Sequence, residues 1–504
     1  MSMPAEHLIT ETFLDVLLER LANAPALPVV DIASDSRRLK MGSLFLACEG
    51  ATHHGLDFWE PALEAGAVAI AYDSSTATKV PGDIGIPLVP VANLANHLGE
   101  IANRFFGSPS EQLEVVGVTG TNGKSSVAWM IAQSLDRLGR KCAYAGTLGY
   151  GIGEIDSDDN MTTPDVIEMH RRLATFRDNG ADHAAVEVSS HALDQRRVDG
   201  VRFHAALFTN LTRDHLDYHG SMRAYGDAKA KLFVEHRANN RIINLDSEFG
   251  SELAARCGND VITVSTKFDR VANGRPFVFV RSIITQATGS RVHLQTSWGN
   301  GSAFVPLPGD FNIANAVLVL AYLLADNFEL EDACAALAEL SAPPGRMQRV
   351  AVTHGPAVYI DYAHTPNALD HALRALRAHC RANVWCVFGC GGDRDAGKRP
   401  LMARIAERLA DRVVICNDNP RSEPPAKIVD DILAGLTKTD TATVIEDRAA
   451  AIAWAIANAD ASDVVLIAGK GHENYQIIGN DRLDFSDYDA ALGNLEALRP
   501  EGRA

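Results

Sequence analysis

The chain contains 504 residues, of which 46% are hydrophobic, and it carries a formal net charge of −17. This length exceeds what one hydrophobic core supports and predicts about three domains. The acidic net charge argues against a nucleic-acid partner, because phosphate backbones bind to basic surfaces. For the same reason, an anionic substrate would require a local basic pocket.

The cysteine spacing and the apolar runs exclude several protein classes. The eight cysteines include no CxxC pair, so the sequence indicates neither a zinc site nor a disulfide framework. The N-terminus has no basic region followed by a long apolar run, and no segment reaches the roughly 18 apolar residues that a membrane helix requires. We therefore expect a cytoplasmic, monomeric protein with reduced thiols and no membrane insertion.

Residues 1–108 are predicted to form a small α/β unit. The polar run Ser34-Asp35-Ser36-Arg37 precedes a short apolar strand at 43–47. The unit is expected to end at a seam of turn-forming residues, Gly107-Ser108-Pro109-Ser110.

The next segment, 109–340, is predicted to be a nucleotide-binding domain. Apolar runs of strand length recur in it, separated by helical or loop stretches, at 115–118, 184–188, 205–208 and 242–245. Apolar runs that alternate with helical stretches in this way are typical of a parallel sheet.

The first of these strands leads into a glycine loop, Gly120-Thr121-Asn122-Gly123, and then into Lys124-Ser125-Ser126 at the start of a helical pattern. Glycines let successive backbone N–H groups turn toward one anion, and the helix start adds a positive dipole. Lys124 supplies a point charge, and Ser125 stands where a hydroxyl can ligate Mg²⁺. The sequence therefore predicts a loop that binds ATP or GTP.

The match to the strict P-loop pattern is imperfect, because Val118 stands where the first glycine is expected. An ordinary glycine turn between a strand and a helix would explain Gly120 and Gly123. It would not explain the adjoining Lys-Ser-Ser at the helix start, so we prefer the phosphate loop.

Polar residues also mark the ends of the following strands, at the edge where open α/β sheets bind ligands. Glu187 lies inside an apolar run, where a carboxylate is costly unless it is paired or metal-bound. We predict that it is a Mg²⁺ ligand, and a salt-bridged structural glutamate is the alternative.

The run 208–219 contains two aspartates and two histidines directly after a strand. Mg²⁺ prefers oxygen ligands, so the residues alone leave His215 open between a metal ligand and a hydrogen-bonding or capping residue.

Residues 341–504 are predicted to form a third unit. Ser341-Ala342-Pro343-Pro344-Gly345 interrupts the helical pattern before a strand at 357–360. Further strands are predicted, each running directly into a polar cluster, at 384–388, 413–416 and 464–468.

These polar clusters are GCGGDRD at 389–395, DNPR at 418–421 and GKGHE at 469–473. The first does not match GxGxxG and is too charged for a dinucleotide pyrophosphate. The clusters alternate cations and anions around one rim, which suits a zwitterionic ligand. We therefore predict an α/β protein of three domains, with a central P-loop ATPase-type parallel sheet and a C-terminal Rossmann-like domain.

Together and in this order, the motifs resemble those of the ATP-dependent Mur ligases over almost the whole chain. The matching runs are GVTGTNGKSS, EVSSH followed by Gln195 and Arg197, TNLTRDHLDYHG, YGDAKAKLF, PGDFNIANA, DYAHTP, GCGGDRD, DNPR and GKGHE. Within the family, the resemblance is to the branch that adds meso-diaminopimelate.

This resemblance implies a two-step ligation in peptidoglycan precursor synthesis. ATP would phosphorylate the γ-carboxylate of D-glutamate in UDP-MurNAc-L-Ala-D-Glu, and an amine of diaminopimelate would attack the acyl phosphate. The products would be ADP, phosphate and UDP-MurNAc-tripeptide. Phosphorylation is needed because a free carboxylate is a poor acyl donor, and the anionic transition state needs Lys124 and Mg²⁺ around it.

The resemblance also implies the catalytic residues Lys124, Glu187, His215 and Lys229. Glu187 and His215 would hold Mg²⁺ together with Ser125, and Lys229 would hold a second Mg²⁺ as a carbamate. A carbamylated lysine is an anion on a long stem, whereas an ammonium would repel the metal. The residue type alone favours an exposed, solvated helical lysine at position 229.

The binding residues implied by the resemblance fall into two further groups. Besides the loop from Gly120 to Ser126, ATP would contact Asn315, Arg346 and Asp361 through its adenine, phosphates and ribose. The UDP-sugar peptide would contact Ser34, Ser36, Ala51, Thr52, His53, Thr162, Thr163, Ser189, Gln195 and Arg197. Met161 departs from the family pattern, because some relatives have a polar residue at this position before the Thr162-Thr163 pair.

The acceptor site is expected to distinguish diaminopimelate from lysine by its extra distal carboxylate. Arg421 with Arg394 offers bidentate donors to that carboxylate, and Glu473 can accept a hydrogen bond from the distal ammonium. Rim arginines on a solvated face are the alternative. The full predicted set is Arg394, Asp418, Asn419, Pro420, Arg421, Gly469 and Glu473.

Three rival functions remain from the sequence. The DNPR motif argues against a lysine-adding Mur ligase. A folylpolyglutamate synthase-like ligase would need a pterin pocket instead of a UDP-binding N-terminal domain. A P-loop switch or binding module would hydrolyse nucleotide slowly with no acceptor, which the third unit argues against. Because the predicted site is divided between three domains, we also expect domain closure to assemble it.

Overall fold

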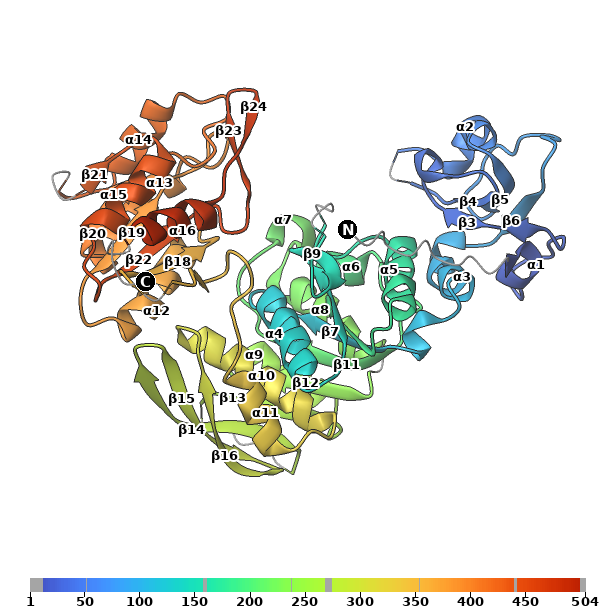
Figure 1. The fold of residues 1–504 in the computed structure, drawn as a ribbon. Coiled ribbons are helices and arrows are strands. Elements are labelled where there is room, and N and C mark those ends of the chain that lie inside the picture. The colour runs from blue at the N-terminus through green and yellow to red at the C-terminus, as the bar shows by residue number, and fades with distance from the viewer. Residues whose placement is uncertain are drawn as a thin grey trace, which may run out of the picture. The chain divides into compact units, whose positions relative to one another are not determined.

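The computed structural model describes residues 12–50, 52–156, 161–236, 238–267, 274–352, 354–438 and 442–498. The chain divides into two compact units, Met1–Lys124 with Ile131–Thr263, and Ser125–Met130 with Val264–Ala504. Both units combine helices with sheets, as the sequence predicts (Figure 1).

The first unit begins with a small parallel sheet. Its strands pair in the order β3 (Asp31–Ala33), β4 (Ser43–Ala47), β5 (Ala67–Asp73) and β6 (Leu88–Val91). A short antiparallel pair, β1 (Thr12–Phe13) and β2 (Pro28–Val29), and three helices accompany it: α1 (Leu14–Leu17), α2 (Trp59–Glu64) and α3 (Leu98–Phe105). The predicted strand at 43–47 is confirmed.

The core of this small sheet is shared with helix α5 (Val166–Asp178). Leu46 and Ile101 lie in one buried cluster with Val166 and Ile167. Burial of apolar surface is the main source of folding stability, so α5 fastens the N-terminal sheet to the sheet that follows the predicted seam.

The larger sheet of the first unit contains the predicted parallel strands. In sheet order they are β12 (Asn240–Asn244), β11 (Phe203–Phe208), β7 (Glu114–Thr119), β10 (His183–Glu187) and β8 (Cys142–Gly146), with β9 (Gly149–Ile152) antiparallel at the edge. Its other helices are α4 (Lys124–Arg137), α6 (Ser190–Asp194), α7 (Leu216–His219), α8 (Met222–Val234) and α9 (Glu248–Arg256).

The register of this sheet determines where its polar residues meet. Glu187 on β10 pairs with Val118 of β7, and Phe208 on β11 pairs with Thr119 of β7. Because parallel strands end at the same edge, the segments after β7, β10 and β11 emerge side by side.

Strand β13 (Ile262–Ser265) contains the boundary between the two units. In the second unit, an antiparallel meander follows: β14 (Phe277–Gln286), β15 (Gly289–Thr296) and β16 (Gly299–Val305). Helices α10 (Asp310–Ala325) and α11 (Leu330–Leu337) come next. This meander was not predicted from the sequence, because β14 and β16 are largely exposed or intermediate and β15 alternates buried with less buried residues.

The C-terminal sheet has the order β17-β18-β22-β19-β20-β21. The strands are β17 (Gln348–Arg349), β18 (Ala357–Asp361), β22 (Val464–Ala468), β19 (Val384–Phe388), β20 (Arg412–Ile415) and β21 (Ala442–Val444), and only β17 pairs antiparallel. A hairpin, β23 (Tyr475–Ile478) with β24 (Asp481–Asp484), follows β22.

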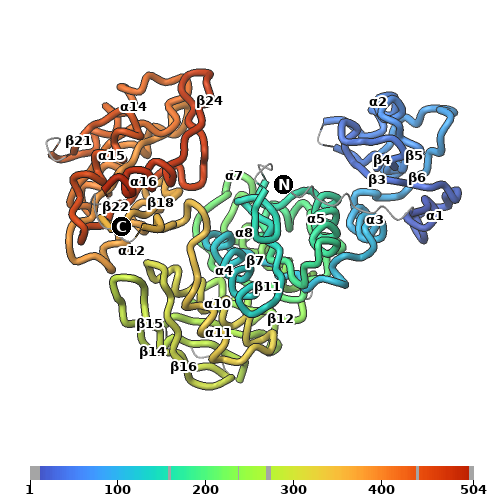
Figure 2. Tube along the Cα trace, in the orientation of Figure 1, coloured from blue at the N-terminus to red at the C-terminus, as the bar shows by residue number. Residues whose placement is uncertain are grey.

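Helices cover both faces of the C-terminal sheet (Figure 2). One face packs against α12 (Pro366–His379), α13 (Lys398–Leu409) and α14 (Pro425–Leu433), the other against α15 (Arg448–Asn458) and α16 (Asp487–Ala497). The predicted fold class is confirmed. Within the described residues, no helix is long and apolar enough to cross a membrane.

Candidate functional site

The predicted strand–loop–helix arrangement is present between β7 and α4. Gly120 and Gly123 have φ angles of 148° and 87°, which place them in the region that favours glycine. Lys124 Nζ donates to the carbonyl oxygens of Gly120 at 3.1 Å and Thr121 at 2.9 Å, so the lysine lies against its own loop. Backbone N–H groups at the start of a helix favour anions, so the observed geometry is compatible with the predicted phosphate site.

The loop is tied to the segment after β11. Thr209 Oγ1 donates to Asn122 O at 2.6 Å, and Asn210 Nδ2 donates to the same oxygen at 3.1 Å. A Cβ at Gly120 would lie 1.9 Å from Thr209 Oγ1. The absence of a side chain at Gly120 is therefore required for this contact.

We expect Gly120→Ala to displace the loop and lower ATP affinity by about 10- to 100-fold, because a methyl group at this φ both collides and strains the backbone. Nucleotide affinity measured by calorimetry checks the prediction. Gly82→Ala is the control, since a Cβ there meets nothing within 4 Å. Equal affinities in the two variants would contradict it.

Lys229 lies on α8 and is 1% exposed. Its Nζ donates to Gly120 O at 2.8 Å and lies 4.3 Å from the centroid of the Tyr225 ring. Burial, and then repulsion by Lys124, hold the pKa of Lys229 well below its ordinary value. The exposed helical lysine that the residue type alone favours is therefore wrong, and the structure brings Lys229 to the phosphate loop.

Glu187 is fully buried at the end of β10. Its carboxylate accepts hydrogen bonds from the Tyr144 hydroxyl, from Thr147 N at 2.8 Å and from Thr147 Oγ1 at 3.2 Å. Gly146 leaves the necessary space, because a Cβ there would lie 2.1 Å from Glu187 Oε1. These hydrogen bonds orient the carboxylate at the edge of the sheet.

His215 precedes α7 with a φ of 49° and occupies the N-cap position of that helix. Its side chain makes no capping hydrogen bond, so the capping alternative is not supported. Its ring centroid lies 5.9 Å from that of Tyr225, the residue that also contacts Lys229. The structure therefore places His215 and Lys229 around one tyrosine.

Two further histidines, His191 and His219, join this aromatic cluster, and the sequence assigned neither of them a role. The His191 ring lies 4.9 Å from that of His215, and His219 lies 5.2 Å from Tyr225. Burial is the main cause that lowers the pKa of both imidazoles, so their surroundings favour the neutral form. The sequence feature that could have predicted this cluster is the local density of histidines in EVSSH and LDYHG.

The residues predicted to contact the peptide substrate surround Arg197. Arg197 Nη1 donates to Thr163 O at 2.9 Å and contacts Met161 Sδ at 3.6 Å, and its Nε donates to Gln195 Oε1 at 3.0 Å. Thr163 Oγ1 donates to Glu187 O at 2.8 Å and accepts from Ser189 N at 3.1 Å.

Thr162 connects this group to the buried carboxylate. Its Oγ1 lies 3.1 Å from Thr147 Oγ1, which in turn donates to Glu187. The structure thus brings the predicted residues Thr162, Thr163, Ser189, Gln195 and Arg197 together.

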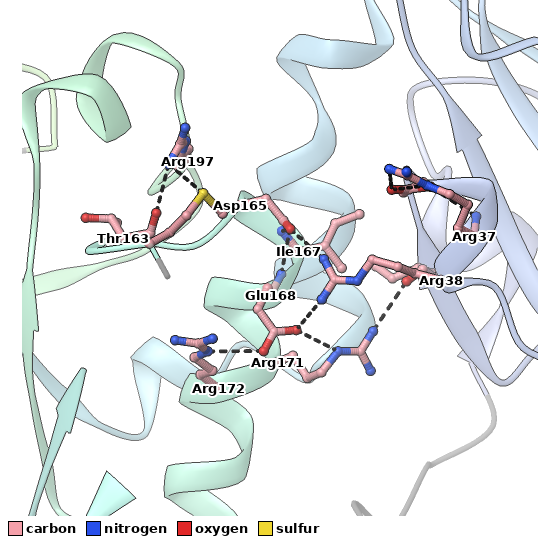
Figure 3. A network of polar contacts seen from close by, with 12 residues as sticks. Arg37, Arg38, Thr163, Asp165, Ile167, Glu168, Arg171, Arg172 and Arg197 are labelled. Atoms are coloured by element: carbon pink, nitrogen blue, oxygen red, sulfur yellow. Dashed lines mark hydrogen bonds and ion pairs between the residues drawn. The ribbon is translucent and has the colours of Figure 1, made fainter. Parts of the chain in front are cut away.

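One of the predicted N-terminal residues, Ser34, lines a pocket of about 340 Å³. Ser34 and Arg38 line it from the small sheet, and Asp165 and Glu168 line it from α5. Arg38 pairs with Asp165 at 2.8 Å and with Glu168 at 3.3 Å, as Figure 3 shows. The pocket therefore contains a basic side chain, whose charge Asp165 and Glu168 offset in this structure.

The remaining N-terminal residues lie in two short segments. Ser36 begins a 3₁₀ turn that Asp35 caps through the Arg37 N–H. Thr52 and His53 are exposed, and the His53 ring contacts that of Phe58. Ala51 lies outside the described residues.

In the second unit, Arg346 and Asp361 lie close to each other. Asp361 ends β18 and accepts from Met347 N at 2.7 Å, and the Arg346 guanidinium lies 4.7 Å from the Tyr362 ring centroid. Asn315 is buried in α10. Burial raises the pKa of Asp361 to about 6, although Arg346 opposes the shift.

We expect Asp361→Asn to change how stability depends on pH. The raised pKa means that the folded state binds the proton more tightly than the unfolded chain, so ionisation lowers the stability of the wild type as pH rises from about 4 to 6. The variant cannot ionise and should gain about 3 kcal/mol over the wild type across that window. Nucleotide-free thermal denaturation at several pH values measures this, and a constant difference would contradict it.

The predicted acceptor segments meet beyond β20 and β22. Arg421 has a φ of 51°, and its Nη1 donates to Gly392 O at 2.9 Å and Asn419 O at 3.4 Å. Its backbone pairs with hairpin β23–β24, donating to Ile477 O at 3.1 Å. Arg421 is thus held by the loop after β19 and by the hairpin.

Lys470 is a buried residue of this site that the sequence analysis did not assign. It is 0% exposed, and its Nζ donates to Asn419 Oδ1 at 3.1 Å and to Glu473 Oε2 at 3.2 Å. Asn419 Nδ2 also donates to Glu473 Oε2 at 3.0 Å. Lys470 therefore compensates the charge of Glu473 and fixes the amide orientation of Asn419. The position of Lys470 within the GKGHE motif is the sequence feature that could have predicted its place in this site.

The other predicted acceptor residues border this network. Asp418 accepts from Asn419 N at 2.7 Å, and a Cβ at Gly469 would lie 2.6 Å from Asp418 Oδ2. Pro420 follows them and accepts from Glu423 N at 3.1 Å. Arg394 is exposed and donates to Asp393 O at 3.3 Å.

Three family models match the chain in succession. One described as the Mur ligase family catalytic domain matches residues 29–106, the Mur ligase middle domain matches 118–323, and the Mur ligase glutamate ligase domain matches 345–471.

Curated relatives match along the full length. The UDP-N-acetylmuramoyl-L-alanyl-D-glutamate--2,6-diaminopimelate ligase of Pseudomonas putida is 45% identical over 502 residues, 99% of each chain. The protein of the same name from Pseudomonas aeruginosa is 46% identical over 468 residues, covering 93% of this chain and 95% of its own.

Solved structures are similar as well. A structure of a ligase with that name has a TM-score of 0.74 at 30% identity, covering 97% of this chain and 99% of its own. A Mycobacterium tuberculosis folylpolyglutamate synthase complexed with ADP and AMPPCP has a TM-score of 0.58 at 20% identity, over 80% of this chain and 96% of its own, so it shares the fold.

Proposed function

The chain belongs to the Mur ligase family, and we propose from that premise that it joins meso-diaminopimelate to the D-Glu γ-carboxylate of UDP-MurNAc-L-Ala-D-Glu with ATP. The observation that carries the proposal is the 45% identity to a diaminopimelate ligase over 99% of both chains. The reaction belongs to peptidoglycan precursor synthesis.

The chemistry divides into two displacements. An oxygen of the γ-carboxylate attacks the γ-phosphorus of ATP, the bond to the bridging oxygen breaks, and ADP leaves. The amine nitrogen of diaminopimelate then attacks the acyl carbon, loses a proton to solvent, and the carbon–oxygen bond to phosphate breaks. The protein positions the reactants and offsets charge, which is where most of the rate enhancement of phosphoryl transfer arises.

The loop from Gly120 to Ser126 is proposed to bind the phosphates of ATP. Its N–H groups and the start of α4 supply positive potential. Lys124, which donates to Gly120 O and Thr121 O, would exchange these acceptors for phosphate oxygens. Asn315, Arg346 and Asp361 are proposed to contact adenine, phosphate and ribose.

Mg²⁺ is proposed to be held by Ser125, Glu187, His215 and carbamylated Lys229. The donor set fits, because Glu187 is a buried, oriented carboxylate and a carbamate would place an anion at the end of the Lys229 side chain. When bound, Mg²⁺ supplies positive charge that offsets the charge of the phosphates.

Carbamylation of Lys229 is supported by its environment. The neutral amine attacks CO₂, a carbon–nitrogen bond forms, and one proton is released. Only the neutral amine has the required lone pair, and burial lowers the pKa of Lys229 toward that form.

The UDP-sugar peptide is proposed to bind along the first unit. Ser34 lines the pocket that also contains Arg38, and the other N-terminal contacts would come from Ser36, Thr52 and His53. Its peptide would contact the group around Arg197: Thr162, Thr163, Ser189, Gln195 and Arg197.

Diaminopimelate is proposed to bind at the second unit's segments 418–421 and 469–473. Arg421 and Arg394 would bind the distal carboxylate, and Glu473 would accept from the distal ammonium. The contacts of Arg421 with Gly392 O and Asn419 O support a fixed guanidinium.

The organisation of the chain remains part of the proposal. We infer three domains, 1–108, 109–340 and 341–504, which act as a monomer in the cytoplasm. A site divided between domains would be completed by their closure.

The proposal is tested by phosphate release from ATP and Mg²⁺ with UDP-MurNAc-L-Ala-D-Glu, comparing meso-diaminopimelate with L-lysine. We expect release that depends on diaminopimelate. Preference for lysine would indicate a lysine-adding ligase, and release that ignores both acceptors would indicate a nucleotide-hydrolysing module. Activity with folate and glutamate would instead indicate a folylpolyglutamate synthase.

A further inference from the structure

Arg448 and Asp487 form an ion pair in the interior of the C-terminal part of the second unit. Both side chains are 0% exposed. Arg448 Nε donates to Asp487 Oδ1 at 2.7 Å, and Nη2 donates to Oδ2 at 2.7 Å. The two residues begin helices α15 and α16. A buried bidentate pair of this kind holds the guanidinium plane in one orientation.

The same guanidinium reaches the ends of two strands. Nη2 donates to Ala468 O at 3.0 Å, and Nη1 donates to Asn417 O at 3.4 Å. Ala468 ends β22, and Asn417 follows β20. Strand β19 lies between β22 and β20 in the sheet, so the two carbonyl groups belong to strands that do not pair with each other. Arg448 therefore spans the strand between them.

The two carbonyl groups stand directly before the proposed acceptor segments. Asn417 leads into 418–421, and Ala468 leads into 469–473. These segments contact each other through Asn419 Nδ2 and Glu473 Oε2 at 3.0 Å. A change in the separation of the two strand ends would therefore move Arg421 relative to Glu473.

We propose that Arg448 is a positioning residue that fixes the separation of the two acceptor segments and thereby the preference for diaminopimelate over lysine. This inference rests on the proposed function. Lysine differs from diaminopimelate by one carboxylate, so the preference requires the recognising groups to be held within about 0.5 Å of the productive geometry. Arg448 acts through the backbone, since its side chain is buried.

The test is Arg448→Lys in the full chain. The ammonium keeps a positive charge for Asp487 but lacks the planar fork that reaches both carbonyl groups. We expect the KM for diaminopimelate to rise about tenfold with the KM for ATP unchanged, and the ratio of kcat/KM values for diaminopimelate and lysine to fall about tenfold.

Asp463→Asn is the matched control. Asp463 is also buried in this sheet, but it lies before β22 and accepts from Asn383 N at 3.0 Å and Trp385 Nε1 at 2.9 Å. We expect it to lower the Tm without altering the acceptor preference. If Arg448→Lys does not fold, Asp487→Asn, which keeps the guanidinium, should show a smaller shift in the same direction.

The outcomes separate the two proposals. If the wild-type enzyme prefers diaminopimelate and the Arg448 and Asp487 variants keep that preference, only the positioning role of Arg448 is overturned. The same would follow if Asp463→Asn changed the preference as much as Arg448→Lys. A wild-type enzyme that does not use diaminopimelate would overturn the proposed function itself.

Discussion

Lys229→Ala is expected to lower kcat by about 10³-fold, which corresponds to about 4 kcal/mol of transition-state stabilisation. The variant removes the amine that donates to Gly120 O and that would become the carbamate. Removing a buried, desolvated amine should leave the fold intact, so the loss should appear in catalysis rather than in the Tm. Steady-state phosphate release and thermal denaturation measure the two effects.

Two controls make this result specific. Lys231→Ala changes a partly exposed lysine on the same helix that pairs with Asp194 at 3.0 Å, and it should retain activity within about twofold. Lys229→Arg keeps a cation but cannot form the carbamate, so it should be as inactive as alanine. Isotope-labelled bicarbonate should give a carbamate signal in the wild type only. An active Lys229→Arg enzyme would exclude the carbamate.

Arg421→Ala is expected to reduce kcat/KM for diaminopimelate by about 10²- to 10³-fold while ATP affinity changes little. A charge-assisted bidentate interaction with a carboxylate is worth a few kcal/mol in a partly buried site, and lysine has no distal carboxylate to lose. The preference for diaminopimelate over lysine should therefore collapse. Acceptor kinetics and nucleotide calorimetry measure the two quantities separately.

The side chain of Arg421 also holds Gly392 O and Asn419 O, so a general loosening of the loop must be distinguished from lost recognition. Arg421→Lys keeps the charge without the fork and should recover only part of the preference. Arg482→Ala, which removes a guanidinium stacked 4.0 Å from the Tyr475 ring on the neighbouring hairpin, is the control. Equal loss of ATP binding and diaminopimelate use in Arg421→Ala would refute the assignment.

The buried charged groups of the two units differ in how their charges are compensated. Glu473 has Lys470 and Asn419 as partners, so its charge is balanced within the acceptor site. Among the described residues, the Lys229 amine has a carbonyl oxygen and a ring face, Gly120 O and Tyr225, as its contacts and no carboxylate within 4.0 Å. A buried amine in such surroundings favours its neutral form, which explains why a reactive role is expected of Lys229 and a structural one of Lys470.

The sequence by itself determined the parallel strands, the phosphate loop and the order of motifs. The strands at 43–47, 115–118, 184–188, 205–208 and 464–468 are confirmed because apolar runs and their flanking turns are local signals. The loop between β7 and α4 is confirmed for the same reason, since glycines followed by Lys-Ser define it within a few residues. The antiparallel meander β14–β16 was missed, because half-exposed strands give a weaker local signal.

Only the tertiary structure decided which polar residues meet and what charge they carry. Lys229 lies 109 residues from Gly120 along the chain, and Arg448 contacts strand ends on both sides of β19. Such contacts form when separate strands assemble into one sheet, so no local pattern encodes them. The pKa of Lys229 and of Asp361 likewise depends on desolvation by residues distant in sequence, which is why the sequence favoured a solvated lysine where the fold buries one.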